Sequence, residues 1–225
     1  VMDEISRRNS AAELVGTRLV GRELGEGLDL DGIDARGVAA SHAPAGLAAI
    51  SSRQGLWIAE MDKDDGPFLS KAKCQDKNVK LLDLGSVSWS PPSGRPGCLA
   101  AVNKRCVLLW DAEKSEVCGN FESGGGQRSL TDLHWEHVLV TGGMDGSVSI
   151  HDPRQLTKVA ATFQAKAFGH MQVRCSRLNP SLIAGANAGT VLVWDIRAGN
   201  RPLHSIMAHV SNKIGTVDWH PRKAE

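Results

Sequence analysis

One short pattern recurs along this chain of 225 residues, and a repeat of this kind constrains the fold more than any other sequence feature. The pattern is an apolar run that ends in an aspartate and continues into polar turn residues. It is clearest in "GTVLVWDIRAGN", and it returns in "RCVLLWDAEKS", "GSVSIHDPRQL" and, more faintly, "GLWIAEMDKDD". The aspartates are Asp62, Asp111, Asp152 and Asp195. Neighbouring copies lie about 40 to 50 residues apart, which indicates an array of similar structural units.

A second marker keeps the same spacing. A strand-like run recurs at about the same interval, and it ends at Trp89, Trp135, Cys175 or Trp219. The two markers stay in phase, which chance similarity between apolar strands would not produce. Each period divides into short runs of strand-forming residues bounded by Gly, Asn, Asp, Ser or Pro. In the third period the expected strands are 130–135, 138–141, 147–151 and 158–163.

Local features of the repeat support short strands joined by tight turns. Asp145-Gly146 is a strong hairpin signal, because glycine tolerates the positive φ that a primed turn requires. The run 191–193 is apolar on both faces, as expected of a strand packed between two sheets. Four short strands in each period, with a Trp-Asp pair at the end of the third, are typical of WD repeats. We therefore predict an all-β, incomplete WD40-type β-propeller of about four blades plus the first strand of a fifth.

The repeat also predicts how the chain is divided. Residues 1–26 stand outside the pattern and are expected to form a disordered leader or a ring-closing strand, while residues 27–225 form the propeller part. We expect the chain to be a piece of a longer protein, since the fifth unit stops after one strand. The 225 residues alone would then expose the fourth blade's far face and be unstable or self-associate. The repeat units are expected at 27–66, 78–123, 127–164, 168–208 and 209–225.

Composition narrows the possible functions. The formal net charge is +1, so no global attraction draws the chain to nucleic acid or to an anionic membrane. The sequence has no apolar run of about 18 residues and no secretory signal at its start. The five cysteines are scattered and never spaced as CxxC. We interpret them as reduced thiols of an intracellular protein, without a disulfide framework or a zinc site.

The Trp-Asp pairs are predicted to be structural. A buried tryptophan supplies apolar area between blades and seeks an acceptor for its indole N–H, and in WD repeats a Trp, Ser/Thr, Asp and His network provides one. Here the network is eroded, because Lys104 and Ala188 replace its turn residue and His151 stands where a tryptophan is expected. The blades should therefore depend more on packing. The positions assigned structural roles are Trp89, Trp110, Asp111, Trp135, Thr141, Asp145, Asp152, His170, Trp194, Asp195, His209 and Trp219.

No motif indicates catalysis. The run "SGGGQRS" lacks the ending of a phosphate-binding loop, and His134 and His137 have no third ligand nearby in sequence that would make a metal site. We assign no catalytic, cofactor-binding or metal-binding residue and expect no cofactor and no small-molecule substrate. The run "WDIR" matches a short box by which some WD-repeat proteins dock onto cullin ubiquitin-ligase adaptors. Arg197 is therefore a candidate adaptor-docking residue, and a substrate receptor of a cullin-type ligase is the alternative function.

Longer runs carry a family resemblance. "LTDLHWEHVLVTGGMDGSVSIHD", "QVRCSRLNPSLIAGANAGTVLVWDIRAGNRPLHSIMAH" and "AHVSNKIGTVDWHP" resemble consecutive blades of the WD repeat-containing protein 59 family, over roughly residues 27–221. The resemblance implies a non-enzymatic scaffold within the SEA/GATOR complex, which acts upstream of the TOR kinase in amino-acid signalling. It also implies that the other complex subunits are the partners, and that the protein is cytoplasmic and held at the lysosomal or vacuolar membrane through its complex. Members of this family are several times longer and continue into RWD and RING-like regions.

Overall fold

A computed structural model of the chain describes residues 32–41, 46–61, 68–72, 81–123, 129–152, 155–210 and 213–223. The predicted leader 1–26, Asp62, Cys74 and most of the "SGGGQRS" run lie outside the described residues. Every regular element of the described residues is a β-strand, and the strands form four antiparallel four-stranded sheets. The predicted all-β, WD40-type propeller fold of about four blades is thereby confirmed.

The sixteen strands follow the chain in four consecutive groups. The first sheet contains β1 (Ala35–Ala40), β2 (Leu47–Ser52), β3 (Leu56–Glu60) and β4 (Phe68–Lys71). The second contains β5 (Leu84–Trp89), β6 (Cys98–Asn103), β7 (Cys106–Asp111) and β8 (Glu116–Glu122). The third contains β9 (Leu130–Trp135), β10 (Leu139–Gly143), β11 (Ser147–His151) and β12 (Val159–Gln164). The fourth contains β13 (Met171–Cys175), β14 (Leu182–Asn187), β15 (Thr190–Asp195) and β16 (His204–Met207).

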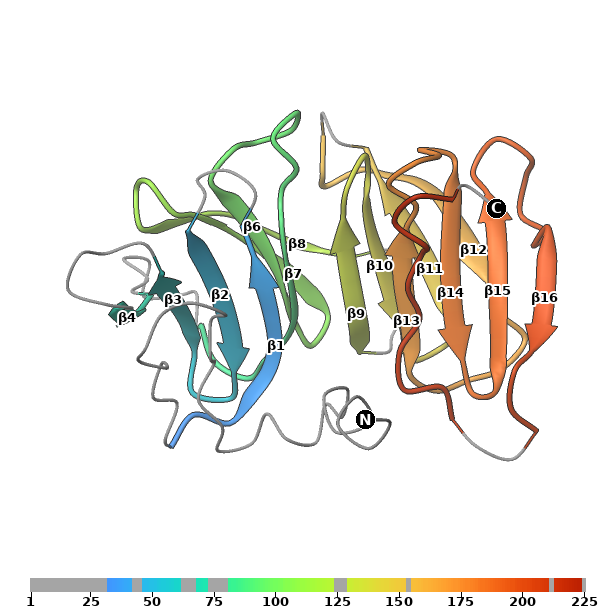
Figure 1. Cartoon of the computed structure of the whole chain (residues 1–225), viewed down its shortest axis with the longest axis horizontal. Coiled ribbons are helices and arrows are strands. Elements are labelled where there is room, and N and C mark those ends of the chain that lie inside the picture. Colours follow the sequence, from blue (N-terminus) through green and yellow to red (C-terminus); the bar gives the residue numbers. More distant parts are fainter. Residues whose placement is uncertain are drawn as a thin grey trace, which may run out of the picture.

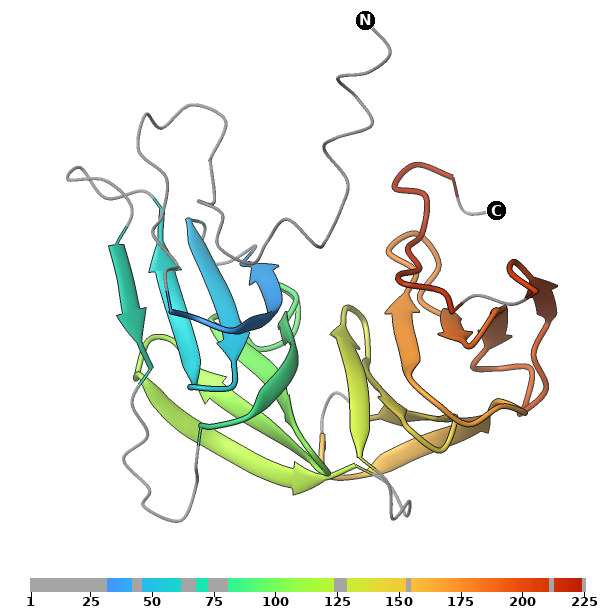
Figure 2. The ribbon, with the colours of Figure 1, turned by 90° about the horizontal axis from the view of Figure 1, so that it is seen from below.

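The four sheets follow one another in an open arc (Figures 1 and 2). Within each sheet the strands pair in sequence order, so one edge is always the first strand and the other the fourth. The first strands β1, β5, β9 and β13 lie on the concave side of the arc, each beside the next. This arrangement brings one strand from each of four separate sequence repeats to the same side of the arc.

The third sheet tests the predicted strands directly. β9 and β11 have the predicted bounds, whereas β10 and β12 each begin and end one or two residues later than predicted. The Asp-Gly hairpin is present, but Asp145 does not have a positive φ and only Gly146 does, at 80°. Gly146 N–H donates to Gly143 O over 3.0 Å, so a three-residue turn ending in a left-handed glycine replaces the predicted primed turn.

The pairing register corrects the repeat marker of the first unit. In the second sheet Asp111, the last residue of β7, pairs with Cys98, the first residue of β6. In the fourth sheet Asp195 of β15 pairs with Leu182 of β14 in the same way, and the two hairpins have the same length. In the first sheet the residue at this place is Glu60, which pairs with Leu47. The marker was placed two residues too late, because the faint first copy offered an aspartate just beyond the strand.

Large side chains fill the spaces between neighbouring sheets. Trp194 of β15 is fully buried, and its ring stacks on Phe163 of β12 with 5.6 Å between centroids and 6° between planes. Phe121 of β8 makes the corresponding contact with His151 of β11, at 5.2 Å and a tilt of 58°. A fourth-strand aromatic residue of one sheet thus packs against the third strand of the next. These contacts hold the sheets in the arc.

Residues 212–221 were expected to start a fifth blade, but the structure assigns no strand at 213–221. The segment runs beside β13 (Figure 1). Its backbone is held by Ile214 N–H, which donates to Ala188 O over 2.8 Å, whereas its hydrogen bonds with β13 are of side chain to backbone. Trp219 Nε1 donates to Arg174 O over 2.9 Å, and Gln172 Nε2 donates to Gly215 O. The segment pairs with no described strand, so it lies in the position of a first strand without a hydrogen-bonded ladder.

Candidate protein-interaction site

The concave side of the arc contains a cavity of about 680 Å³. Its wall is formed by the first strands of all four sheets together with residues from the loops that follow β9 and β13. Both signs of charge line it, from Arg36 on β1 to Asp218 beside β13. The cavity wall is therefore a polar surface assembled from every repeat unit.

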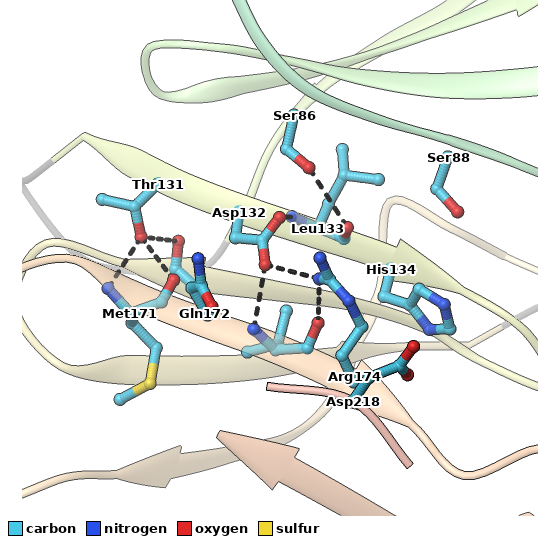
Figure 3. A network of polar contacts seen from close by, with 12 residues as sticks. Ser86, Ser88, Thr131, Asp132, Leu133, His134, Met171, Gln172, Arg174 and Asp218 are labelled. Atoms are coloured by element: carbon cyan, nitrogen blue, oxygen red, sulfur yellow. Dashed lines mark hydrogen bonds and ion pairs between the residues drawn. The ribbon is translucent and has the colours of Figure 1, made fainter. Parts of the chain in front are cut away.

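Asp132 is the centre of the polar network in this wall (Figure 3). Its Oδ2 accepts hydrogen bonds from Val173 N–H at 3.0 Å and from Arg174 Nη1 at 2.7 Å, while Oδ1 accepts from Leu133 N–H at 2.9 Å. The carboxylate is buried, and its charge is balanced by the Arg174 guanidinium. A buried carboxylate is tolerated only when it is paired and hydrogen-bonded in this way. Asp132 therefore joins β9 to β13, where no backbone ladder connects them.

Thr131 and His134 extend the same junction along β9. Thr131 Oγ1 accepts from Met171 N–H at 3.0 Å and donates to Met171 O at 2.7 Å. His134 Nδ1 accepts from Cys175 N–H at 3.1 Å, which requires an unprotonated Nδ1. Burial, together with the nearby Arg174 charge, lowers the pKa of His134 to about 4. The neutral imidazole is thus the form that this contact and its surroundings both favour.

Hydrogen bonds between a side chain and the backbone of a neighbouring first strand also connect the other sheets. Ser88 Oγ on β5 accepts from Trp135 N–H of β9 at 3.1 Å. Trp89 Nε1 donates to Ala39 O of β1 at 2.9 Å, as Trp219 does to Arg174 O at the same distance. Trp89 and Trp219, predicted to be equivalent from the repeat, therefore make equivalent hydrogen bonds to the preceding first strand.

The predicted Trp-centred network is present only in part. The indole N–H groups of Trp110 and Trp194 are buried, and neither has a hydrogen-bond partner among the described residues. In the third sheet the network hydroxyl belongs to Thr141, which lies on β10 two residues after the partner of His151.

In the fourth sheet Trp194 takes the place of His151, and the residue two positions after its partner on β14 is Gly185. A Cβ at Gly185 would lie 2.7 Å from Cζ3 of Trp194. A tryptophan ring thus occupies the space that a network hydroxyl would need.

His151 keeps its hydrogen bonds in place of the expected tryptophan. Nδ1 donates to Leu156 O at 2.9 Å, because a carbonyl can only accept, and Nε2 then accepts from Ser123 Oγ at 2.9 Å. Thr141 Oγ1 lies 3.3 Å from the same nitrogen. Burial lowers the pKa of His151. The third sheet therefore retains a polar core that the second and fourth have replaced by packing.

The predicted aspartates mainly cap turns. Asp111 Oδ1 accepts from Glu113 N–H and Lys114 N–H. Asp145 Oδ1 accepts from the backbone N–H and the hydroxyl of Ser147. The backbone oxygen of Asp152 accepts from Gln155 N–H. These contacts stabilise the loops rather than a binding site.

The remaining predicted positions are on the surface. His170 and His209 are exposed, and their imidazoles have no hydrogen-bond partner among the described residues. They therefore do not complete a Trp-centred network among the described residues, although His170 lines the cavity.

Arg197, the candidate docking residue, follows β15, and its Nε and Nη2 donate to Asp195 at 3.3 and 3.2 Å. Hydrogen bonds from Arg197 lower the pKa of Asp195.

Sequence reasoning missed the polar residues of the cavity wall. Thr131, Asp132 and Arg174 lie in the short runs "LTDLHW" and "MQVRC", which were interpreted only as strands, and His134 was considered only as half of a histidine pair without a third metal ligand. The available signal was a charged residue at a buried strand position, which requires a partner from another element.

Within the part of the chain that the structure describes, no group of three or more His, Cys, Asp and Glu side chains is placed to hold a metal ion. The described residues also include no helix with the length and apolarity needed to cross a membrane.

Comparison with known proteins agrees with the fold. No family model matches the chain. A WD repeat-containing protein of Dictyostelium discoideum is 29% identical over 184 residues, which cover 78% of this chain and 9% of that protein. The GATOR2 complex protein Wdr59 of Drosophila melanogaster is 26% identical over 176 residues, which cover 76% of this chain and 17% of that protein. Cell division cycle 20.1, cofactor of APC complex, of Arabidopsis thaliana is 30% identical over 149 residues, which cover 62% of this chain and 31% of that protein.

A solved structure shows the same architecture. A chain of the crystal structure of the mitotic checkpoint complex superposes with a TM-score of 0.70 at 20% identity, over 92% of this chain and 62% of that one. The fold and the relatives together define a WD-repeat β-propeller, a class whose members generally serve as non-catalytic protein-interaction scaffolds. Its relatives include a GATOR2 complex protein at modest identity. This chain spans only a small part of the length of the three relatives named above, between 9% and 31%.

Proposed function

We propose that this chain is a non-enzymatic scaffold within a SEA/GATOR-type complex, that it regulates TOR kinase signalling in response to amino acids, and that the complex holds it at the lysosomal or vacuolar membrane. The observation that carries the proposal is the likeness to the Drosophila GATOR2 complex protein Wdr59, which covers 76% of this chain. The run "AHVSNKIGTVDWHP" adds support, because it includes Trp219, which packs along β13 in the manner of the other repeats.

The cavity wall supplies a surface suited to a protein partner. Its arginines are already paired with acids, as in Arg36–Asp83 at 2.7 Å, Arg174–Asp132 at 2.7 Å and Arg177–Glu136 at 3.7 Å. Side chains fixed in this way lose little conformational freedom when a partner binds. A wall with both signs of charge favours a partner with a complementary pattern rather than a uniformly charged polymer.

The test is affinity purification of the tagged full-length protein from its own cells. We expect subunits of a SEA/GATOR-type complex to co-purify and loss of the gene to alter the TOR response to amino-acid withdrawal. Arg177→Glu reverses an exposed charge on the wall, and Lys114→Glu reverses a similarly exposed charge on a turn outside it. The first variant should recover less of the complex, while the second should behave as wild type. Recovery of unrelated complexes by both wild type and variants would contradict the proposal.

The cullin-type substrate receptor is the second candidate, because Arg197 of the predicted docking box is 71% exposed. Its guanidinium is held by Asp195 and so points in a defined direction. If this candidate is correct, a cullin-ligase adaptor should co-purify with wild type and be lost from Arg197→Ala. The same variant should retain the SEA/GATOR-type subunits if the first proposal holds, so one purification separates the two candidates.

A further inference from the structure

Two cysteines of the second sheet lie close together without forming a disulfide. The Sγ atoms of Cys98 and Cys118 are 3.8 Å apart, and both are free thiols. Cys98 is the first residue of β6 and is buried, whereas Cys118 lies on β8 and is exposed. The pair therefore combines a solvent-accessible sulfur with a protected one.

A β-bulge explains how Cys118 comes near Cys98. On β8, Gly119 pairs with Leu109 and Val117 pairs with Trp110, so Cys118 is the extra residue between two pairs. A bulged residue is left out of the ladder, and its side chain is directed differently from those of its neighbours. Because the backbone pairing does not fix Cys118, its sulfur has freedom to move that a regular strand residue lacks.

The surroundings favour a thiolate on the exposed sulfur. The hydrogen bond from Cys98 lowers the pKa of Cys118 to about 7. The same hydrogen bond, together with burial, raises the pKa of Cys98. Among the charged neighbours, Arg95 favours the thiolates and Asp111 opposes them. Cys118 is the one described cysteine whose pKa is lowered, since burial raises the pKa of Cys106 and of Cys175.

We propose that Cys118 is a peroxide-reactive nucleophile and that Cys98 is the thiol that resolves it. The Cys118 thiolate attacks one oxygen of hydrogen peroxide, and the O–O bond breaks to give a Cys118 sulfenic acid and, after proton uptake, water. The Cys98 sulfur then attacks the sulfenic sulfur, and a second water leaves as the disulfide forms. Two thiols are oxidised and one peroxide is reduced to two waters, as in other paired-cysteine sensors.

The disulfide requires the sulfurs to approach from 3.8 Å to about 2 Å. Movement at the bulge supplies this approach, because Cys118 is exposed and outside the ladder. The product would connect β6 to β8 across β7 and so fix the outer strand of the second sheet. A dithiol reductant would reverse it.

Native-state labelling of the wild-type chain is the first test, and it needs no variant. Cys118 should react with iodoacetamide at pH 7 about tenfold faster than Cys106, which is partly exposed and has no hydrogen-bond donor among the described residues. Stoichiometric peroxide should then give a Cys98–Cys118 disulfide in the peptide map. Equal labelling rates, or oxidation without this cross-link, would overturn the proposal.

Variants separate the two roles of Cys98, as hydrogen-bond donor to Cys118 and as resolving thiol. All of them carry Cys74→Ser. Cys98→Ser keeps a donor but removes the resolving thiol, so a Cys118 sulfenic acid should accumulate and be trapped by dimedone. Cys98→Ala removes the donor as well, and labelling of Cys118 should slow by about tenfold. Cys106→Ser is the control and should leave both results unchanged. Unchanged labelling in a folded Cys98→Ala protein, checked by its melting curve, would show that Cys98 does not activate Cys118.

Discussion

Trp194 shows how a single side chain can support the contact between two blades. It is fully buried between Phe163 of the third sheet and the backbone of Gly185 in its own sheet. We expect Trp194→Ala to lower the free energy of unfolding by about 3–5 kcal/mol, because it removes a large buried aromatic side chain. Trp194→Phe should cost less, since it keeps a ring against Phe163. Denaturant melts measure both, and an alanine variant as stable as wild type would mean that the blade contact is wrong.

Asp132 allows charge and hydrogen bonding to be separated at the cavity wall. Asp132→Ala leaves Val173 N–H without an acceptor and the Arg174 guanidinium without its acidic partner, and we expect a loss of about 3–5 kcal/mol in the free energy of unfolding. Asp132→Asn keeps an oxygen for Val173 N–H and should lose about 1–2 kcal/mol. Equal effects of the two variants in chemical denaturation would contradict the role assigned to the backbone hydrogen bond.

His134 gives this wall a pH dependence. Its pKa is lowered from 6.5 to about 4 in the folded chain, so the unfolded state binds the proton more readily. The contribution of the neutral His134 to the free energy of unfolding is complete above pH 6.5 and decreases by about 3 kcal/mol as the pH falls to 4. In unfolding measurements across this range, His134→Asn should reduce the loss relative to wild type. His204→Asn, at an exposed histidine of β16, is the control and should leave the pH profile unchanged.

At the scale of the strand, the sequence period located the sheets but not all of the strand ends or the contacts between neighbouring sheets. It predicted the bounds of β9 and β11 because alternating apolar residues and turn residues mark them locally. It placed the ends of β10 and β12 wrongly, since a strand ends where its neighbour stops pairing. It also missed the contacts of Asp132 and Thr131, because they depend on how far apart the first strands of two sheets lie. Such distances are a property of the assembled arc.

Gly185 in β14 shows one strand position that is determined by the next strand. A Cβ at this position would lie 2.7 Å from the Trp194 ring, which cannot move because Phe163 packs on its other side. We expect Gly185→Ala to reduce stability by about 1–3 kcal/mol through overpacking. Gly215→Ala, with no atom within 4 Å of the new Cβ, should have little effect. Melting temperatures of the two variants test this, and equal values would mean that the ring has room to shift.

For the whole molecule, the fourth sheet differs from the second and third in how its fourth strand is covered. Phe121 and Phe163 on β8 and β12 are covered by the following sheet, whereas every residue of β16 is exposed. Ile206 is 55% exposed, Met207 71% and the nearby Val210 94%. An unpaired strand edge beside an exposed apolar surface favours self-association.

We therefore expect the 225-residue chain to self-associate through the exposed side of the fourth sheet. Its mean molecular mass in light scattering should rise with concentration. Met207→Glu places a charge on that surface, so it should shift the distribution towards monomer by about tenfold in association constant. Leu178→Glu is the matched control, because Leu178 is an exposed apolar residue in the loop between β13 and β14, and it should associate as wild type does. A wild-type chain that stays monomeric at every concentration and melts cooperatively would show that the exposed strand is not a binding edge.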